Sequence, residues 1–409
     1  MKRLMTIFML VSSVQRLHAG SAIWNSSPTS NDWDTATNWT PATIPYSETD
    51  VATFGASNVT SSVRLGAAPD DFDASNIVGS IVFTEGAPSY TITVAPVFDV
   101  IFPSILEFYG AGITNNSGVV QNFYAPPSGD GSESGRFYFN NSSSAGENVV
   151  ITNQGGDSAT PDGDYGGFTS LEDTSTAGKA TFVNNGGTVS GARGGFTDLL
   201  FSCNADNATF ICNPGEVSGA LAAWTLVQTL GNIGSSTFIG NPATVAGAEG
   251  GWVEIDYATA AGANFIANGA TTAGPQAGQI YVYGGDGYAI FTGNGGQGSG
   301  AEGGLIDLFG LSPSNQTIVI AKGGTNGGLG GNIVIEGDPA LDLGQFQVFG
   351  DGLLDLSRAA NGIVIGSLAG DGMVSLGGYS LSIGNNNLST IFSGVSSTVG
   401  ESRSWAAGP

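Results

Sequence analysis

The segment Ala180-Thr181-Phe182-Val183-Asn184-Asn185-Gly186-Gly187 decides the fold, because the chain repeats its pattern. The large apolar residue recurs with spacings of 28, 28, 27, 26 and 28 residues, at Phe182, Phe210, Phe238, Phe265, Phe291 and Val319. A glycine follows each of these residues nine positions later. A fixed period in this range predicts a stacked solenoid, in which each repeat is one coil that buries its apolar side against neighbouring coils.

We expect two strands in each coil. In the first strand, Ala180, Phe182 and Asn184 share one face because side chains alternate along a strand. The large residues of successive coils should therefore form a single file through the interior. We extend that file toward the N-terminus with Ile113 and Val150, which have an asparagine at the same offset.

A row of asparagines follows the first strand. Three positions after each file residue stand Asn185, Asn213, Asn241, Asn268 and Asn294, and Lys322 takes the next place. Stacked asparagines can hydrogen-bond to their copies in the coils above and below, so this row predicts a side-chain ladder.

The second strand follows a glycine doublet such as Gly194-Gly195. Its inward residues end at Leu199, Val227, Ile255, Val282 and Leu308. With a rise of ~4.8 Å per coil, about eight such coils would form a rod roughly 40 Å long. The fold class that we expect is all-β, a parallel β-helix.

The chain divides into four expected regions. They are a signal peptide at residues 1–22, an N-terminal β capping region at 23–104, a solenoid of about eight coils at 105–340, and Gly-rich β repeats at 341–409. A cap is needed because the first coil of a solenoid has an open strand edge.

The first residues predict export. Met1-Lys2-Arg3 is positively charged, residues 4–14 are mostly apolar, and small residues follow, so the pattern is that of a secretory signal peptide. Cleavage fits after Ala19 or after Ala22. No later stretch is long and apolar enough for a membrane-spanning helix. We expect a secreted or cell-surface location.

Charge and histidine content exclude several functions. The formal net charge is −24, with 10 Lys and Arg against 34 Asp and Glu, so we expect no nucleic-acid partner. The only histidine, His18, lies in the expected signal peptide, which leaves the mature chain without the usual general base or zinc ligand. We expect no cofactor and no enzymatic activity.

Cys203 and Cys212 lie nine residues apart. An exported protein can form a disulfide. However, Cys212 occupies a row in which the other coils carry small residues, and free cysteine packs as a small apolar residue. We therefore favour buried free thiols.

Three segments resemble autotransporter passenger proteins that carry autotransporter-associated β-strand repeats. They are the opening Trp33-Asp34-Thr35-Ala36-Thr37-Asn38-Trp39 with residues 50–54, the coil phrase of residues 175–187, and the passenger-associated repeat of residues 366–394. The resemblance implies a right-handed parallel β-helix outside the cell. Such proteins continue to a C-terminal membrane barrel, so it also implies that residues 341–409 belong to a truncated region. The sequence is then a fragment, an early-terminated reading frame, or a protein exported without a barrel of its own.

Three aromatic residues begin the second strand of consecutive coils: Phe196, Trp224 and Trp252. Stacked outward, they would form an apolar strip for sugar rings, with hydrogen-bond acceptors beside it at Asp198, Glu254 and Asp256. In the competing interpretation, a loop or the capping region covers the three aromatics, because exposed apolar patches rarely lack a partner.

A second candidate site is a calcium site in an inserted corner. It would use the carboxylates of Asp157, Asp162 and Asp164. The spacing does not match an EF-hand loop, and Gly-Asp pairs are also ordinary turn sequences.

The expected function is that of a non-enzymatic surface protein, an adhesin or stalk, that acts as a monomer on host or environmental glycans or cell surfaces. The alternative from another class is a polysaccharide-degrading enzyme that uses two carboxylates, for which Glu254 and Asp256 are the best pair. The third hypothesis is that the protein is a spacer that binds no ligand.

Overall fold

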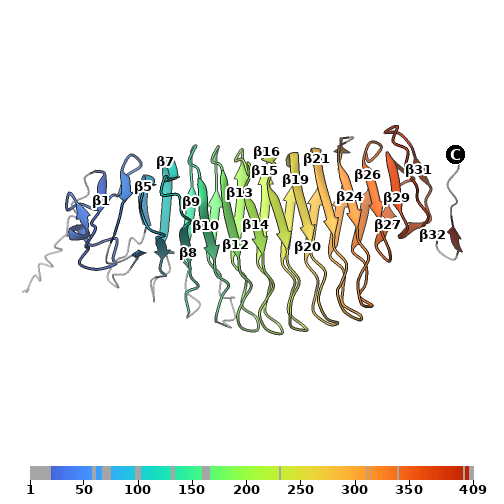
Figure 1. Cartoon of the computed structure of the whole chain (residues 1–409), viewed down its shortest axis with the longest axis horizontal. Helices are drawn as coiled ribbons and strands as arrows, with labels where there is room; N and C mark the ends of the chain where they lie inside the picture. The colour runs from blue at the N-terminus through green and yellow to red at the C-terminus, as the bar shows by residue number, and fades with distance from the viewer. Residues whose placement is uncertain are drawn as a thin grey trace, which may run out of the picture.

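The computed structural model describes residues 20–57, 61–66, 75–96, 103–129, 134–158, 166–229, 232–310, 312–314, 316–338, 340–398 and 401–404. Within these ranges nearly all regular structure is β-strand, and one 3-10 turn, η1 (Ala36–Asn38), is helical. The strands wind into an elongated solenoid (Figure 1). The predicted all-β parallel β-helix is confirmed, because neighbouring coils pair through parallel strands.

Two long sheets run the length of the rod. In pairing order, sheet 1 contains β2 (Trp39–Thr40), β1 (Ala22–Trp24), β3 (Val51–Phe54), β5 (Ser75–Phe83), β7 (Ile105–Asn115), β9 (Arg136–Phe139), β11 (Phe168–Leu171), β13 (Phe196–Phe201), β15 (Trp224–Thr229), β18 (Trp252–Asp256), β20 (Gln279–Tyr283), β22 (Leu305–Phe309), β25 (Asn332–Gly337), β27 (Leu353–Ala359), β30 (Met373–Gly377), β32 (Val395–Thr398) and β33 (Glu401–Ser404).

Sheet 2 forms the opposite wall. In pairing order it contains β4 (Ser62–Leu65), β6 (Thr91–Val94), β8 (Gln121–Ala125), β10 (Glu147–Asn153), β12 (Lys179–Asn184), β14 (Thr209–Cys212), β17 (Thr237–Gly240), β19 (Thr259–Ala267), β21 (Asp286–Gly293), β24 (Ile318–Ala321), β26 (Gln345–Val348) and β29 (Ser367–Gly370), with β16 (Asn232–Gly234) on β19 and β23 (Ser312–Pro313) on β21. A separate pair joins β28 (Ile363–Ile365) to β31 (Leu381–Ile383).

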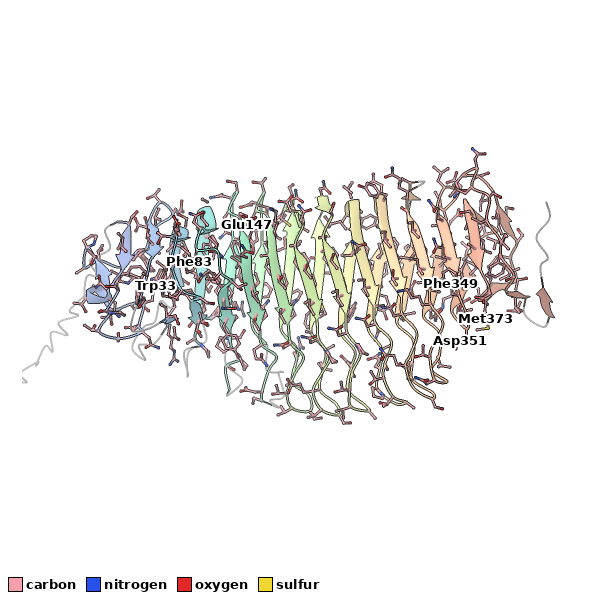
Figure 2. The ribbon with its side chains drawn as sticks, viewed as in Figure 1. Trp33, Phe83, Glu147, Phe349, Asp351 and Met373 are labelled. Carbon is pink, nitrogen blue, oxygen red and sulfur yellow. The ribbon has the colours of Figure 1, made fainter. Side chains whose placement is uncertain are left out.

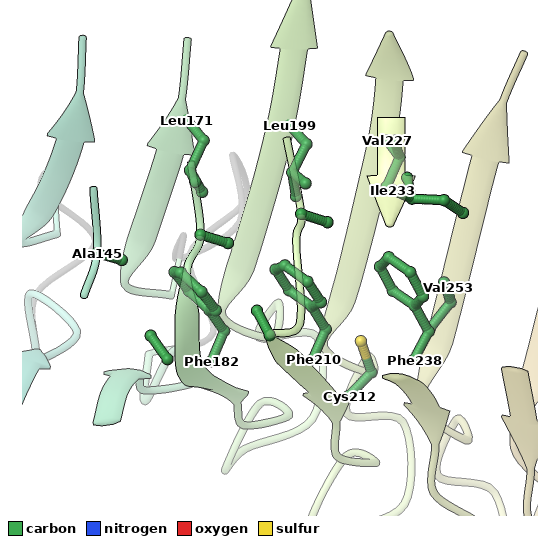
Figure 3. Packing of buried hydrophobic residues seen from close by; sticks show 14 of the residues in the cluster. Ala145, Leu171, Phe182, Leu199, Phe210, Cys212, Val227, Ile233, Phe238 and Val253 are labelled. Carbon is green, nitrogen blue, oxygen red and sulfur yellow. The ribbon is translucent and has the colours of Figure 1, made fainter. Parts of the chain in front are cut away.

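The single file of large apolar residues is confirmed. Phe182 pairs with Phe210, and the register then passes through Phe238, Phe265 and Phe291 to Val319. Successive phenylalanine rings stack almost parallel, with centroids 4.9, 4.8, 5.1 and 4.9 Å apart. Figure 3 shows three of these rings, those of Phe182, Phe210 and Phe238, side by side in one row that faces Leu171, Leu199 and Val227 of sheet 1.

Two earlier members of the file were predicted wrongly. The residue that pairs with Phe182 is Ile151, not Val150, and the coil before contributes Phe123. Ile113 lies in β7 of sheet 1, where it pairs with Ile81. Asn153 pairs with Asn184, and Gln154 is the residue that bonds to Asn185, so the asparagine offset is displaced by one residue in this coil.

The predicted asparagine ladder is also confirmed. The side-chain nitrogen of each asparagine donates to the side-chain oxygen of the one before, at 2.8 to 2.9 Å, through Asn213, Asn241, Asn268 and Asn294. At the start, Asn185 donates to Gln154 at 2.8 Å. Each bond joins two coils, so the ladder holds neighbouring coils in register.

After each ladder residue the chain makes a long excursion, and we call the stack of these excursions the fin. Its members are residues 185–195, 213–223, 241–251, 268–278, 294–304 and 322–331. Figure 1 shows them projecting side by side along one edge of the rod. At the base of the first, the Gly195 amide donates to the Asn185 carbonyl at 2.7 Å.

The glycine row predicted nine positions after the file lies at the tip of the fin. Gly191 has φ +85°, a left-handed conformation that favours glycine, and its amide donates to the Gly219 carbonyl of the next coil at 2.8 Å. In the last excursion the left-handed residues are Asn326 and Gly327, which directly precede Gly328.

Three tryptophans close the N-terminal end. Trp24, Trp33 and Trp39 are buried and pack edge to face, with Trp39 4.7 Å from Trp33 and 5.0 Å from Trp24 between ring centroids. Figure 2 places Trp33 at this end of the rod. Because β1 pairs antiparallel with β2, the outer edge does not present another parallel strand for end-to-end association.

The stacking does not stop at residues 105 and 340. Strands β3 and β5 continue sheet 1 toward the N-terminus, and β26 and β29 continue sheet 2 toward the C-terminus, all in parallel register. The sequence boundaries expected there mark a change in composition, and neither coincides with a break in the sheets. Residues 1–19 of the expected signal peptide lie outside the described residues.

Candidate functional site

The predicted aromatic residues form a row on the outer face of sheet 1. Phe196 pairs with Trp224, and Trp224 with Trp252, because they occupy equivalent positions in β13, β15 and β18. The rings of Phe196 and Trp224 lie 4.5 Å apart. Phe196 and Trp224 are half-buried and Trp252 is 40% exposed, so solvent reaches all three.

The row is longer than the sequence predicted. Phe168 continues it before Phe196, with ring centroids 5.2 Å apart, and Tyr138 lies 5.7 Å from Phe168. At the other end, the Tyr281 ring lies 5.6 Å from that of Trp252. We call these six residues the aromatic strip: Tyr138, Phe168, Phe196, Trp224, Trp252 and Tyr281.

A groove of about 260 Å³ lies where the strip meets the fin. Its floor is formed by Phe168, Phe196 and Trp224, and two arginines line it, Arg136 from β9 and Arg193 from the returning leg of the fin. The Arg136 guanidinium carbon lies 5.6 Å from the centre of the Phe168 ring, a cation–π geometry.

Neither arginine was predicted from the sequence to belong to this site. Arg136 pairs directly with Phe168 and therefore belongs to the same column as Phe196. The coils before residue 180 vary in length, so no fixed period connects Arg136 to that column. Arg193 precedes Phe196 by three residues. It stands directly before the glycine doublet Gly194-Gly195, and this position was the available signal in the sequence.

The predicted acceptors lie beside the strip. Asp198 lies two residues after Phe196 and points outward. Glu254 and Asp256 lie two and four residues after Trp252 and also point outward. Burial raises the pKa of Asp198 to about 7, and the nearby charge of Glu172 adds to the effect. Its Oδ1 atom is buried and, among the described groups, has no hydrogen-bond partner.

The carboxyl groups of Glu254 and Asp256 also have raised pKa values. Burial raises the pKa of Glu254, with a contribution from the charge of Asp256, and burial raises the pKa of Asp256. The oxygens of a carboxyl group accept hydrogen bonds from hydroxyl groups. The row can therefore hydrogen-bond to hydroxyl groups of a ligand lying on the strip.

Further along the row, burial and the charge of Glu336 raise the pKa of Asp307 to about 6. Arg358 bonds to Glu336 at 2.6 Å and lies 3.8 Å from Asp307. This arginine is thus engaged at the far end of the rod and is not part of the groove.

The predicted calcium site is only partly visible. Asp157 is exposed after β10, whereas Asp162 and Asp164 lie outside the described residues. Among the residues that the structure describes, no group of three or more His, Cys, Asp or Glu side chains is placed to hold a metal ion. The calcium site stays a prediction.

Cys203 and Cys212 are both buried and free, as predicted. The Cys212 sulfur lies 3.2 Å from the Thr225 hydroxyl. Burial raises the pKa of each thiol to about 12, so neither is a reactive thiolate near neutral pH. Both cysteines fill the core.

Comparison of the chain with protein-family models, with curated proteins and with solved structures gives no match. The class of the protein therefore rests on its own geometry. It is a parallel β-solenoid that carries a row of aromatic side chains on one outer face. In the part of the chain that the structure describes, no helix has the length and apolarity needed to cross a bilayer.

Proposed function

We propose that the protein is an exported, non-enzymatic surface protein of the autotransporter passenger type, a monomeric β-helical rod that binds glycans through the aromatic strip. The observation that carries the proposal is that each of six neighbouring strands of sheet 1 has an outward aromatic side chain, and that four of these, Phe168, Phe196, Trp224 and Trp252, occupy one register column. Flat apolar rings spaced by the strand separation match the apolar faces of successive sugar rings. The adjacent carboxyl groups supply partners for sugar hydroxyls.

A glycan array tests this function. We expect the wild-type protein to bind a restricted set of oligosaccharides, and Trp224→Ala to weaken that binding by about tenfold or more, equivalent to about 1.4 kcal/mol. Phe309→Ala is the matched control, because Phe309 is a 44% exposed aromatic residue of the same sheet outside the strip. Wild-type binding to nothing on the array, or equal losses in both variants, would contradict the proposal.

Export gives a second prediction. Ala22 is buried at the start of β1 and pairs with Ala52, so cleavage after Ala22 would remove a core residue, whereas cleavage after Ala19 leaves β1 intact. We expect the protein exported from a bacterial host to begin at Gly20, as read by mass spectrometry of its N-terminal peptide. An uncleaved chain retained in the cytoplasm would contradict the export proposal, and a chain beginning at Ile23 would contradict this cleavage site.

One observation favours the enzymatic alternative. Asp198 has a pKa of about 7 beside the strip, a value suited to a general acid or base. A polysaccharide-cleaving enzyme would release new reducing ends or unsaturated products from pectins, alginates or glucans, and Asp198→Asn would abolish their release. Absence of products from the wild-type protein would exclude this alternative for those polymers.

A further inference from the structure

The groove beside the strip gathers positive charge in a protein whose formal net charge is −24. The structure describes the side chains of six Lys and Arg residues: Arg64, Arg136, Lys179, Arg193, Lys322 and Arg358. Two of these six line the one groove. Lys179 and Arg358 lie elsewhere on the rod, beside Glu147 and Glu336.

The backbone on both sides holds the arginines in place. The Arg136 amide donates to the Ser104 carbonyl of the previous coil at 2.9 Å, at the start of β9. The Arg193 carbonyl accepts from the Gly156 amide at 2.7 Å, which ties the returning leg of the fin to the previous coil. Both arginines therefore line the groove from hydrogen-bonded main chain.

The two kinds of side chain in the groove point to one chemistry. A guanidinium group presents a planar set of donors that matches the two oxygens of a carboxylate. The rings of Phe168, Phe196 and Trp224 form an apolar floor beside those donors. A ligand that satisfies both has an apolar ring face and a carboxylate attached to the same ring.

We propose that this groove binds a carboxylate-bearing sugar, a uronate unit of an acidic polysaccharide. The inference rests on the proposed glycan-binding function and specifies its ligand class. The two arginines distinguish such a sugar from a neutral one, because a neutral ring would use only the aromatic floor.

A matched ligand pair tests the inference. Isothermal titration of the purified protein would compare hexagalacturonate with its methyl ester, which has the same ring shape without the charge. We expect the acid to bind at least about tenfold more tightly. Arg136→Gln and Arg193→Gln should each weaken binding of the acid about tenfold and leave binding of the ester unchanged. Unchanged ester binding also shows that each variant is folded.

Lys322→Gln is the matched control, because it removes one positive charge from an exposed position on the fin, outside the groove. It should leave both affinities unchanged. If the ester binds as well as the acid, or if the arginine variants keep the preference for the acid, the inference is overturned while the glycan-binding function stands. If neither ligand binds, the inference is also overturned, and the array with Trp224→Ala decides the broader function separately.

Discussion

Phe238→Ala is expected to lower the free energy of unfolding by about 3–5 kcal/mol, the range for removing a fully buried phenylalanine. Phe238 has no solvent exposure, and its ring lies 4.8 Å from that of Phe210 and 5.1 Å from that of Phe265. The truncation leaves a cavity between two stacked rings, and the coils cannot close it without breaking the strand register above and below. Urea denaturation followed by circular dichroism measures the loss.

The control for this prediction is Phe349→Ala, because Phe349 is 41% exposed. Its expected effect is within about 1 kcal/mol. Equal losses in the two variants would show that Phe238 is not a member of a tightly packed file.

Asp198→Asn is expected to stabilise the protein at pH 8 and to change its stability little at pH 4.5. The folded protein holds a proton on Asp198 up to about pH 7, whereas the unfolded chain releases it near 3.8. Between these values the folded state binds more protons than the unfolded state. The free energy of unfolding therefore falls as pH rises from about 4 to about 7 and levels off above that.

The expected size of this effect is about 2–4 kcal/mol at pH 8. Each tenfold change in proton concentration over this interval contributes up to about 1.4 kcal/mol to the free energy of unfolding. The total is reduced because part of the Asp198 side chain contacts solvent. Asparagine cannot titrate, so the variant should lose the part of the pH dependence that Asp198 contributes, while Asp307, whose pKa is also raised, keeps its own part. Thermal unfolding of both proteins from pH 4.5 to 8 measures it. Asp342→Asn removes an exposed carboxylate for the same change in net charge, and its curve should follow the wild type. Parallel curves for wild type and Asp198→Asn would refute the assignment.

Much of the fold could be predicted because stacking makes like residues neighbours. Where the spacing is nearly constant, from Phe182 to Val319, the sequence predicted both the file and the ladder residue by residue. Where coil length varies, a fixed offset selects the wrong residue: it points to Val150, whereas Ile151 is the residue that pairs with Phe182. Hydrogen-bonded register, not sequence distance, determines which residues meet.

The candidate site was predicted in part for the same reason. Phe196, Trp224 and Trp252 lie 28 residues apart, and their row was visible in the sequence. Arg136 joins the column across a coil of different length, and Arg193 reaches it from the fin, so neither follows the repeat. The raised pKa of Asp198 depends on its burial and on Glu172 of the previous coil, which only the folded arrangement brings near.

The central claim is that successive coils lie directly over each other, and distances between paired spin labels test it most directly. The outward residues Thr181, Ile290, Ile318 and Gln345 occupy one column, the last three being four, five and six coils from the first. Cysteine labels would be placed at Thr181 and at each of the others in turn, with Cys203 and Cys212 replaced by alanine. We expect distances of about 19, 24 and 29 Å, because each coil adds a constant rise of ~4.8 Å. Distances that do not increase steadily with the number of coils would contradict it.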